Sequence, residues 1–101
     1  MILYNVTVKI DTNIHEEWLQ WMKTVHIPDV MATNCFIEHK IMRMIEPPTD
    51  EHGTTYAIQY FCKDVPTLHN YWKEHAPALQ ADHTKRYNGR FGAFRTVMEL
   101  V

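Results

Sequence analysis

A chain of 101 residues with a formal net charge of −2 has the size of one domain, which we expect to span residues 1–101. It has no basic run, so nucleic acid and an anionic membrane surface are poor candidates for its main partner. Its apolar runs are far shorter than the roughly 20 residues that cross a membrane, and Met1–Asn5 does not resemble a signal peptide. We therefore expect a cytoplasmic protein in which Cys35 and Cys62 are reduced.

The first two predicted elements are an amphipathic strand and a helix. Residues 2–10 alternate between apolar and polar side chains, which is typical of a strand with one buried face. Asn13 is a candidate N-cap for the helix, with Glu16 as its capping-box partner. Pro28 is expected to interrupt this helix and to open a short second turn through residues 30–32. The helical spacing predicts a buried face made of Ile14, Trp18, Trp21, Met22 and Val25.

A β-hairpin is predicted next. Residues 36–45 and 54–63 have strand patterns, and the polar segment 46–53 between them is rich in turn formers. Symmetric pairing about this loop predicts a face toward the helices that holds Ile37, Ile41, Ile45, Tyr56, Ile58 and Tyr60. The opposite face would then carry Lys40, Met42, Thr55, Ala57 and Gln59.

The second half of the chain repeats a helical region followed by a strand. Asp64 can cap a helix whose predicted buried side chains are Val65, Leu68, Tyr71 and Trp72. Pro77 ends that helix, and a further helical segment over residues 78–87 places Leu79, His83 and Tyr87 on one face. Residues 91–100 are predicted to form the last strand.

The predicted order β-α-β-β-α-β is that of a ferredoxin-like α+β sandwich, with a four-stranded antiparallel sheet and helices on one face. The other face of the sheet mixes polar side chains with Met42, Met44, Ala57 and Phe61. Such a face suits contact with a second copy around a two-fold axis. We therefore predict a homodimer in which two sheets close an α/β barrel.

Several blocks of the sequence resemble a family known only as a bacterial domain of unknown function. They include residues 2–8, 18–33, 56–60, 75–83 and 93–96, so the resemblance covers essentially the whole chain. It implies a short cytoplasmic protein of the dimeric ferredoxin-like α/β-barrel type and transfers no activity.

A second resemblance is local. The segment from Tyr71 to Pro77 is similar to the Tyr-Trp-x-x-x-His-x-Pro helix motif of EthD-type dimeric barrel proteins, with a spacing one residue shorter and on the second helix instead of the first. Tyr71 and Trp72 belong to this motif and are candidate ligand-binding residues. The alternative for Trp72, as for Trp18 and Trp21, is packing against the sheet.

Two histidines stand before a proline at a predicted helix end, in His26-Ile27-Pro28 and His75-Ala76-Pro77. A pocket imidazole titrates near neutral pH and can serve as a general acid or base, so His26 and His75 are the candidate catalytic residues. The alternative is that each caps the last carbonyls of its helix.

Further candidates for ligand binding are His83, Asn5, Gln59 and Arg95. We expect Asn5, Gln59 and Arg95 to line the barrel from three strands, where Arg95 would suit a carboxylate or phosphate. The alternative for Arg95 is an ion pair with Glu99 on the same strand face, and the alternative for His83 is a packed histidine at the core edge. The histidines lack the tight spacings of metal sites, and we predict neither a metal nor a cofactor.

The leading hypothesis is a homodimer that binds a small, partly apolar or anionic molecule between sheet and helices, near the His-x-Pro turns. As an enzyme it would perform cofactor-independent acid/base chemistry, such as isomerisation or oxygenation, with His75 or His26 moving the proton. The alternatives are a non-catalytic binding or sensing module and a purely structural dimer.

Overall fold

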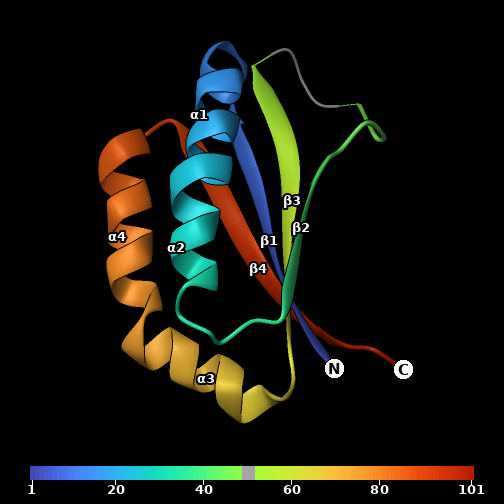
Figure 1. Cartoon of the computed structure of the whole chain (residues 1–101). Coiled ribbons are helices and arrows are strands. Elements are labelled where there is room, and N and C mark those ends of the chain that lie inside the picture. The colour runs from blue at the N-terminus through green and yellow to red at the C-terminus, as the bar shows by residue number, and fades with distance from the viewer. Residues whose placement is uncertain (49–51) are drawn as a thin grey trace.

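The computed structural model describes residues 1–48 and 52–101 (Figure 1). Within these residues four strands form one antiparallel sheet in the order β2-β3-β1-β4, which confirms the predicted ferredoxin-like α+β fold. The strands are β1 (Ile2–Asp11), β2 (Glu38–Arg43), β3 (Gly53–Cys62) and β4 (Phe91–Glu99). The α-helices are α1 (His15–Trp21), α2 (Ile27–Met31), α3 (Val65–Glu74) and α4 (Ala76–Tyr87). Part of the predicted hairpin loop, residues 49–51, lies outside the described residues.

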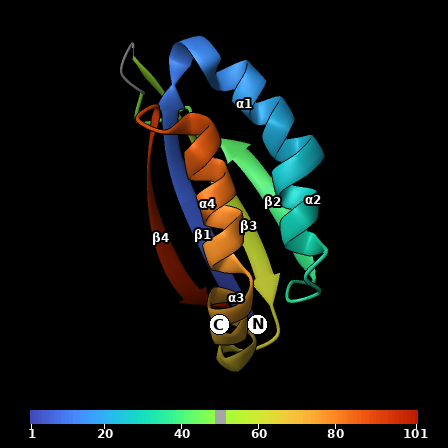
Figure 2. The same ribbon diagram turned by 90° about the vertical axis from the view of Figure 1, so that its left-hand side faces the viewer.

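The helices cover one face of the sheet, and α4 runs beside the continuous helical segment that contains α1 and α2 (Figures 1 and 2). Alternate side chains of β1 enter the core between these layers, because successive residues of a strand point to opposite faces. Tyr4 and Val8 are buried there and lie opposite Tyr60 and Tyr56 of β3. The two cysteines are buried free thiols.

The helix does not begin as predicted. A 3-10 turn (Thr12–Ile14) follows β1, α1 begins at His15, and Asn13 makes no capping bond. The side chain of Asn13 is bonded elsewhere, because its Oδ1 accepts a hydrogen bond from Nη2 of Arg90 at 3.1 Å. Arg90 also pairs with Asp11 at 2.7 Å, so the start of this helix is tied to the chain just before β4.

The helix also continues past its predicted break at Pro28. A π turn (Met22–His26) joins α1 to α2, and Pro28 lies in the first turn of α2. In an α-helix the proline ring would collide with the carbonyl four residues earlier, and the wider π turn displaces that carbonyl. The π turn inserts one residue into the helical pattern, so Val25, which we predicted to be buried, is 39% exposed and His26 turns inward instead.

The predicted hairpin is correct in register but β2 is shorter than expected. Lys40 lies opposite Gln59 and Met42 opposite Ala57, on the face away from the helices, as predicted. Ile41 lies opposite Ile58 on the helix face. The prediction for Ile37 and Ile45 is wrong, because they lie just outside the two ends of β2 and are 64% and 76% exposed.

In the second half, Asp64 caps α3 as predicted, since its Oδ1 accepts hydrogen bonds from the backbone N–H and the hydroxyl of Thr67. Leu68 and Tyr71 are buried, whereas Val65 is exposed. The chain bends at His75, and α4 begins one residue before Pro77, where a proline fits the first helical turn.

Candidate functional site

A cavity of about 260 Å³ lies between the helices and the sheet. Strands β1, β3 and β4 supply one wall, and the π turn, α2, α3 and α4 supply the other. The apolar part of the lining includes Val6, Val8, Ile58, Met22, Val30 and Phe91. The polar part includes Tyr4, Tyr60, Tyr71, His26, His83 and Arg95.

His83 is held by a tryptophan. Nε1 of Trp18 donates a hydrogen bond to Nε2 of His83 at 2.9 Å, and both side chains are buried. An indole nitrogen can only donate, so Nε2 is the unprotonated nitrogen of the imidazole and Nδ1 carries the proton. Burial lowers the pKa of His83 to about 4, with the nearby His26 and Arg95 acting in the same direction. His83 is therefore a neutral Nδ1–H donor at pH 7.

The Nδ1–H group of His83 has no hydrogen-bond partner within the described residues. Every fully buried side-chain nitrogen or oxygen among those residues does have a partner. Nδ1 must consequently keep accessible surface, and His83 borders this cavity. Rings of Trp21, Tyr87 and Phe91 surround the imidazole at centroid distances of 5.8, 5.5 and 4.4 Å.

His26 projects from the π turn toward His83, with the two ring centroids 5.6 Å apart. Neither nitrogen of its half-buried imidazole has a hydrogen-bond partner among the described residues. The alternative, in which His26 caps helix carbonyls, is therefore not observed. Burial lowers the pKa of His26 below 6.5 and Arg95 adds to this, while Asp82 and Asp29 oppose it. A neutral, unpaired imidazole can accept a proton from a molecule in the cavity.

Three tyrosines of the cavity lining lie together. The ring of Tyr4 is 6.1 Å from that of Tyr60 and 6.2 Å from that of Tyr71. Burial raises the pKa of the Tyr60 and Tyr71 hydroxyls, which therefore stay protonated at neutral pH. Within the described residues these hydroxyls have no partner, and by the argument used for His83 they retain accessible surface beside the cavity.

Arg95 lies on the helix face of β4, which corrects the prediction that it shares a face with Asn5 and Gln59. It stands opposite Val6 in the sheet, whereas Asn5 lies opposite Thr96 and Gln59. Among the described residues Arg95 has no ion pair or hydrogen bond, so the alternative pairing with Glu99 is not formed. Its guanidinium borders the cavity and acts on both histidines as a positive charge.

The structure brings His26, His83, Tyr71 and Arg95 together and leaves the other predicted site residues elsewhere. Asn5 and Gln59 are on the outer face of the sheet, where Nδ2 of Asn5 donates to Thr7 at 3.0 Å.

His75 and Trp72 do not border this cavity. His75 sits at the bend between α3 and α4 and borders a separate shallow hollow with Asp29 and Leu79. Trp72 packs edge-on against Tyr4 at 5.6 Å, which agrees with the packing alternative. Sequence analysis did not name Tyr4 and Tyr60 as site residues, because the alternating pattern of their strands identified them only as core residues. A buried tyrosine hydroxyl usually has a polar partner, so the tyrosines at these core positions could have indicated a polar site.

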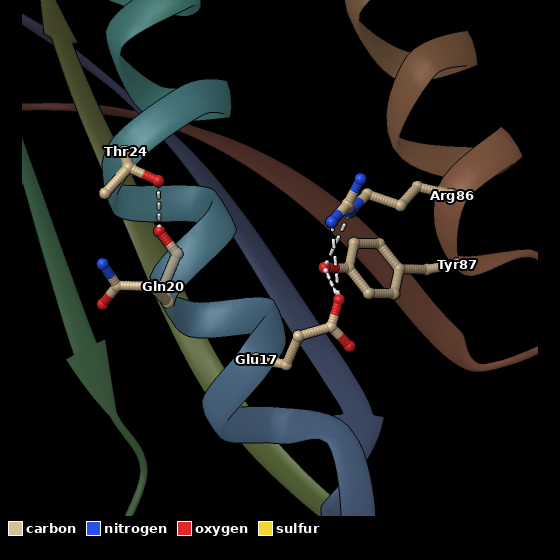
Figure 3. A network of polar contacts seen from close by, with 5 residues as sticks. All are labelled: Glu17, Gln20, Thr24, Arg86 and Tyr87. Carbon is tan, nitrogen blue, oxygen red and sulfur yellow. Dashed lines mark hydrogen bonds and ion pairs between the residues drawn. The ribbon is translucent and has the colours of Figure 1, made fainter.

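A polar network joins α1 to α4 (Figure 3). Oε1 of Glu17 accepts a hydrogen bond from the Tyr87 hydroxyl at 3.3 Å and lies 3.5 Å from Nη2 of Arg86. The Arg86 guanidinium also lies 5.3 Å from the ring of Trp21. These contacts hold together the two helices that carry Trp18 and His83.

Two other features are absent from the described residues. No group of three or more His, Cys, Asp or Glu side chains there could hold a metal ion. Nor does that part of the chain contain a helix with the length and apolar character to cross a membrane.

A family model described as "Domain of unknown function (DUF4286)" matches residues 1–101. No curated protein matches the chain.

Among solved structures, an EthD family protein from Bacillus halodurans has a TM-score of 0.70 at 13% identity, with 100% of each chain covered. A dimeric ferredoxin-like protein from an uncultured marine organism has a TM-score of 0.71 at 15% identity, covering 100% of this chain and 95% of that one. SnoaB from Streptomyces nogalater, described as a cofactor-independent oxygenase, has a TM-score of 0.65 at 8% identity, covering 98% and 92%. At these identities the likeness shows a shared fold.

Proposed function

The chain belongs to the DUF4286 family, and from its cavity we propose that it binds a small, partly apolar anion between sheet and helices. The observation that supports this most directly is the set of hydrogen-bond donors with no partner among the described residues: Arg95, the His83 Nδ1–H and the tyrosine hydroxyls. A polar group that borders a cavity without a protein partner can bind a ligand, because a buried donor without a hydrogen bond is unfavourable. The single cation in this set favours a negative charge on that ligand.

We further propose acid/base chemistry that needs no cofactor, with His26 moving the proton. His26 is the histidine of this cavity whose two nitrogens are both free of hydrogen bonds within the described residues. His83 cannot play this part while its acceptor nitrogen is held by Trp18. Reactions of this type include isomerisation and oxygenation of an activated organic substrate, and the cofactor-independent oxygenase among the structures of like fold supports the second.

The assembly we propose is a homodimer through the outer face of the sheet. Phe94 and Met42 are exposed on that face, next to the polar pair Asn5 and Gln59. A mixed face of this kind suits a self-complementary contact. Two of the structures of like fold are described as dimeric ferredoxin-like proteins, which agrees with this assembly.

Native mass spectrometry of the purified protein, compared with its denatured mass, is the first test. We expect a dimer that carries additional small-molecule mass, and the released molecule then serves as the candidate substrate. A dimer that carries no bound molecule would contradict the binding proposal, and a monomer would contradict the assembly.

His26→Gln separates catalysis from binding, because glutamine keeps a polar side chain but does not exchange protons near neutral pH. We expect unchanged binding of the released molecule and a loss of turnover of about 10²-fold or more. His75→Gln is the matched control, since His75 lies outside the cavity, and its turnover should equal that of the wild type. Full turnover in His26→Gln would leave the non-catalytic binding module as the better description.

A further inference from the structure

The contact between Trp18 and His83 decides what the cavity offers to a ligand. A histidine that is free to choose its tautomer can present either a donor or an acceptor. Here Nε2 of His83 is occupied by the Trp18 indole at 2.9 Å, so the other nitrogen, Nδ1, carries the proton. The rings meet edge to face, with an interplanar angle of 88° and centroids 6.3 Å apart, which directs the N–H of the indole at the imidazole.

We infer that Trp18 is a positioning residue that fixes His83 as an Nδ1–H donor, and that the ligand of this cavity is a small aromatic carboxylate. The inference rests on the proposed function, because it names the ligand class of the same site. It assigns Trp18 a role that burial alone does not explain.

The polar lining matches a carboxylate in number and in charge. A carboxylate has two oxygens and about four lone-pair sites, all of which accept. The cavity offers the His83 N–H, the hydroxyls of Tyr60 and Tyr71, and the guanidinium of Arg95. A guanidinium can bind both oxygens of a carboxylate at once, and its hydrogen bonds to an anion are stronger than those to a neutral group.

The apolar lining and the size of the cavity indicate the remainder of the ligand. Val6, Ile58 and Phe91 also line the space and suit a flat apolar body. The volume of 260 Å³ lies just below the range of about 300–1,000 Å³ that is usual for drug-sized ligands. A body of one ring or two fused rings is therefore expected.

Other charges around His83 agree with this assignment. His26 from the π turn and Arg95 from β4 both lower the pKa of His83, whereas Asp82 from α4 raises it. Asp82 does not border the cavity, so its carboxylate does not compete with a bound anion for the donors there. Tyr87 packs against the same imidazole and uses its hydroxyl to bond Glu17 outside the cavity.

The first part of the test needs no ligand. Long-range ¹H–¹⁵N correlation spectra of the wild-type protein report which nitrogen of each histidine is protonated. We expect Nδ1 of His83 to carry the proton throughout the range from pH 6 to pH 8. Protonation at Nε2, or a doubly protonated ring at pH 6, would overturn the tautomer assignment.

The second part compares Trp18→Phe with Trp21→Phe. Both changes shrink a buried indole next to His83, but Trp21 makes no hydrogen bond to it. In Trp18→Phe the freed Nε2 can carry the proton, so we expect the Nε2–H tautomer of His83 to appear beside the Nδ1–H tautomer. In Trp21→Phe the Nδ1–H tautomer should remain alone. Equal behaviour of the two variants would show that Trp18 acts only by packing. Should Trp18→Phe fail to fold, the wild-type spectra still decide the tautomer.

The third part uses 2-naphthoate as the probe and the uncharged 2-naphthamide as its match in shape. We expect 2-naphthoate to shift the His83 Nδ1 resonance and to bind at least about tenfold more tightly than the amide. In Trp18→Phe its affinity should fall by about tenfold, and in Trp21→Phe by less than twofold.

The probe results separate the inference from the proposed function. Equal binding of acid and amide in the cavity would overturn the ligand class and leave a binding site in place. Absence of any shift at His83 and His26 with either probe near its solubility limit would overturn the aromatic-carboxylate assignment. The proposed function then fails only if native mass spectrometry also shows no bound molecule.

Discussion

His83 stays neutral inside the folded protein although histidines in an unfolded chain titrate near pH 6.5. The imidazole is 8% exposed, and its acceptor nitrogen is already bonded to Trp18. Its depressed pKa means that the unfolded chain binds more protons than the folded protein between pH 6.5 and pH 4. Stability from this residue is thus complete above pH 6.5 and is lost as the pH falls toward 4.

We expect the free energy of unfolding to fall by about 3 kcal/mol between pH 6.5 and pH 4 because of His83, on top of the contribution of other groups. Urea unfolding at a series of pH values measures it. His83→Leu removes the titrating group, and in this variant the fall should be smaller by that amount. The same pH slope in both proteins would show that His83 does not titrate as described.

At the same scale, sequence reasoning named His26, His83, Tyr71 and Arg95, which line the cavity, but could not place all of them. The last strand has apolar side chains at alternating positions of both faces, for example Phe91 and Phe94. Its pattern therefore does not reveal which face carries Arg95. Only the register with β1 places Arg95 opposite Val6 and so beside the cavity.

Among the elements, the strands were predicted best and the first helix least well. Alternation of side chains identifies a strand directly, and β1 and β3 agree with the prediction to within one residue at each end. The π turn escaped prediction because a constant helical period was assumed across Pro28. The apolar stripe in fact shifts by one residue, from Trp18 and Met22 to Ile27 and Val30, and that shift was present in the sequence.

The π turn and Pro28 should be energetically coupled. Deletion of Thr24, which is exposed in the π turn, restores an ordinary helical period and brings a carbonyl against the Pro28 ring. We expect a loss of about 3 kcal/mol in the free energy of unfolding, measured with urea. Adding Pro28→Ala to the deletion should restore most of it, because alanine has no ring to collide.

The single change Pro28→Ala is the control and should alter stability by less than about 1 kcal/mol. If the deletion alone is harmless, or if Pro28→Ala does not rescue it, the π turn is not an accommodation of the proline.

At the scale of the whole molecule, the two faces of the sheet differ in what they contact. The helix face encloses the cavity, and the outer face carries exposed apolar side chains and is the dimer contact that we propose. Phe94 is 62% exposed there and lies opposite Thr7 of β1. A large aromatic side chain on an open sheet face is a typical anchor of an interface.

Phe94→Glu should therefore weaken the homodimer by about thirtyfold or more, because the change buries a charge in the contact. Sedimentation velocity over a range of concentrations measures the shift toward monomer. Val25→Glu is the matched control, since Val25 is also exposed but lies on the helical layer. A dimer that survives Phe94→Glu and dissociates in Val25→Glu would place the contact on the helices.

The hydrogen bond that fixes His83 also gives the protein an optical signal of its own. Trp18 touches His83 directly and Trp21 lies beside both histidines of the cavity. A protonated imidazole quenches indole fluorescence far more strongly than a neutral one. The tryptophan fluorescence of the unlabelled protein should consequently decrease as these histidines gain protons. It should also change when a bound acid alters their charge, so that occupancy of the cavity can be followed by fluorescence.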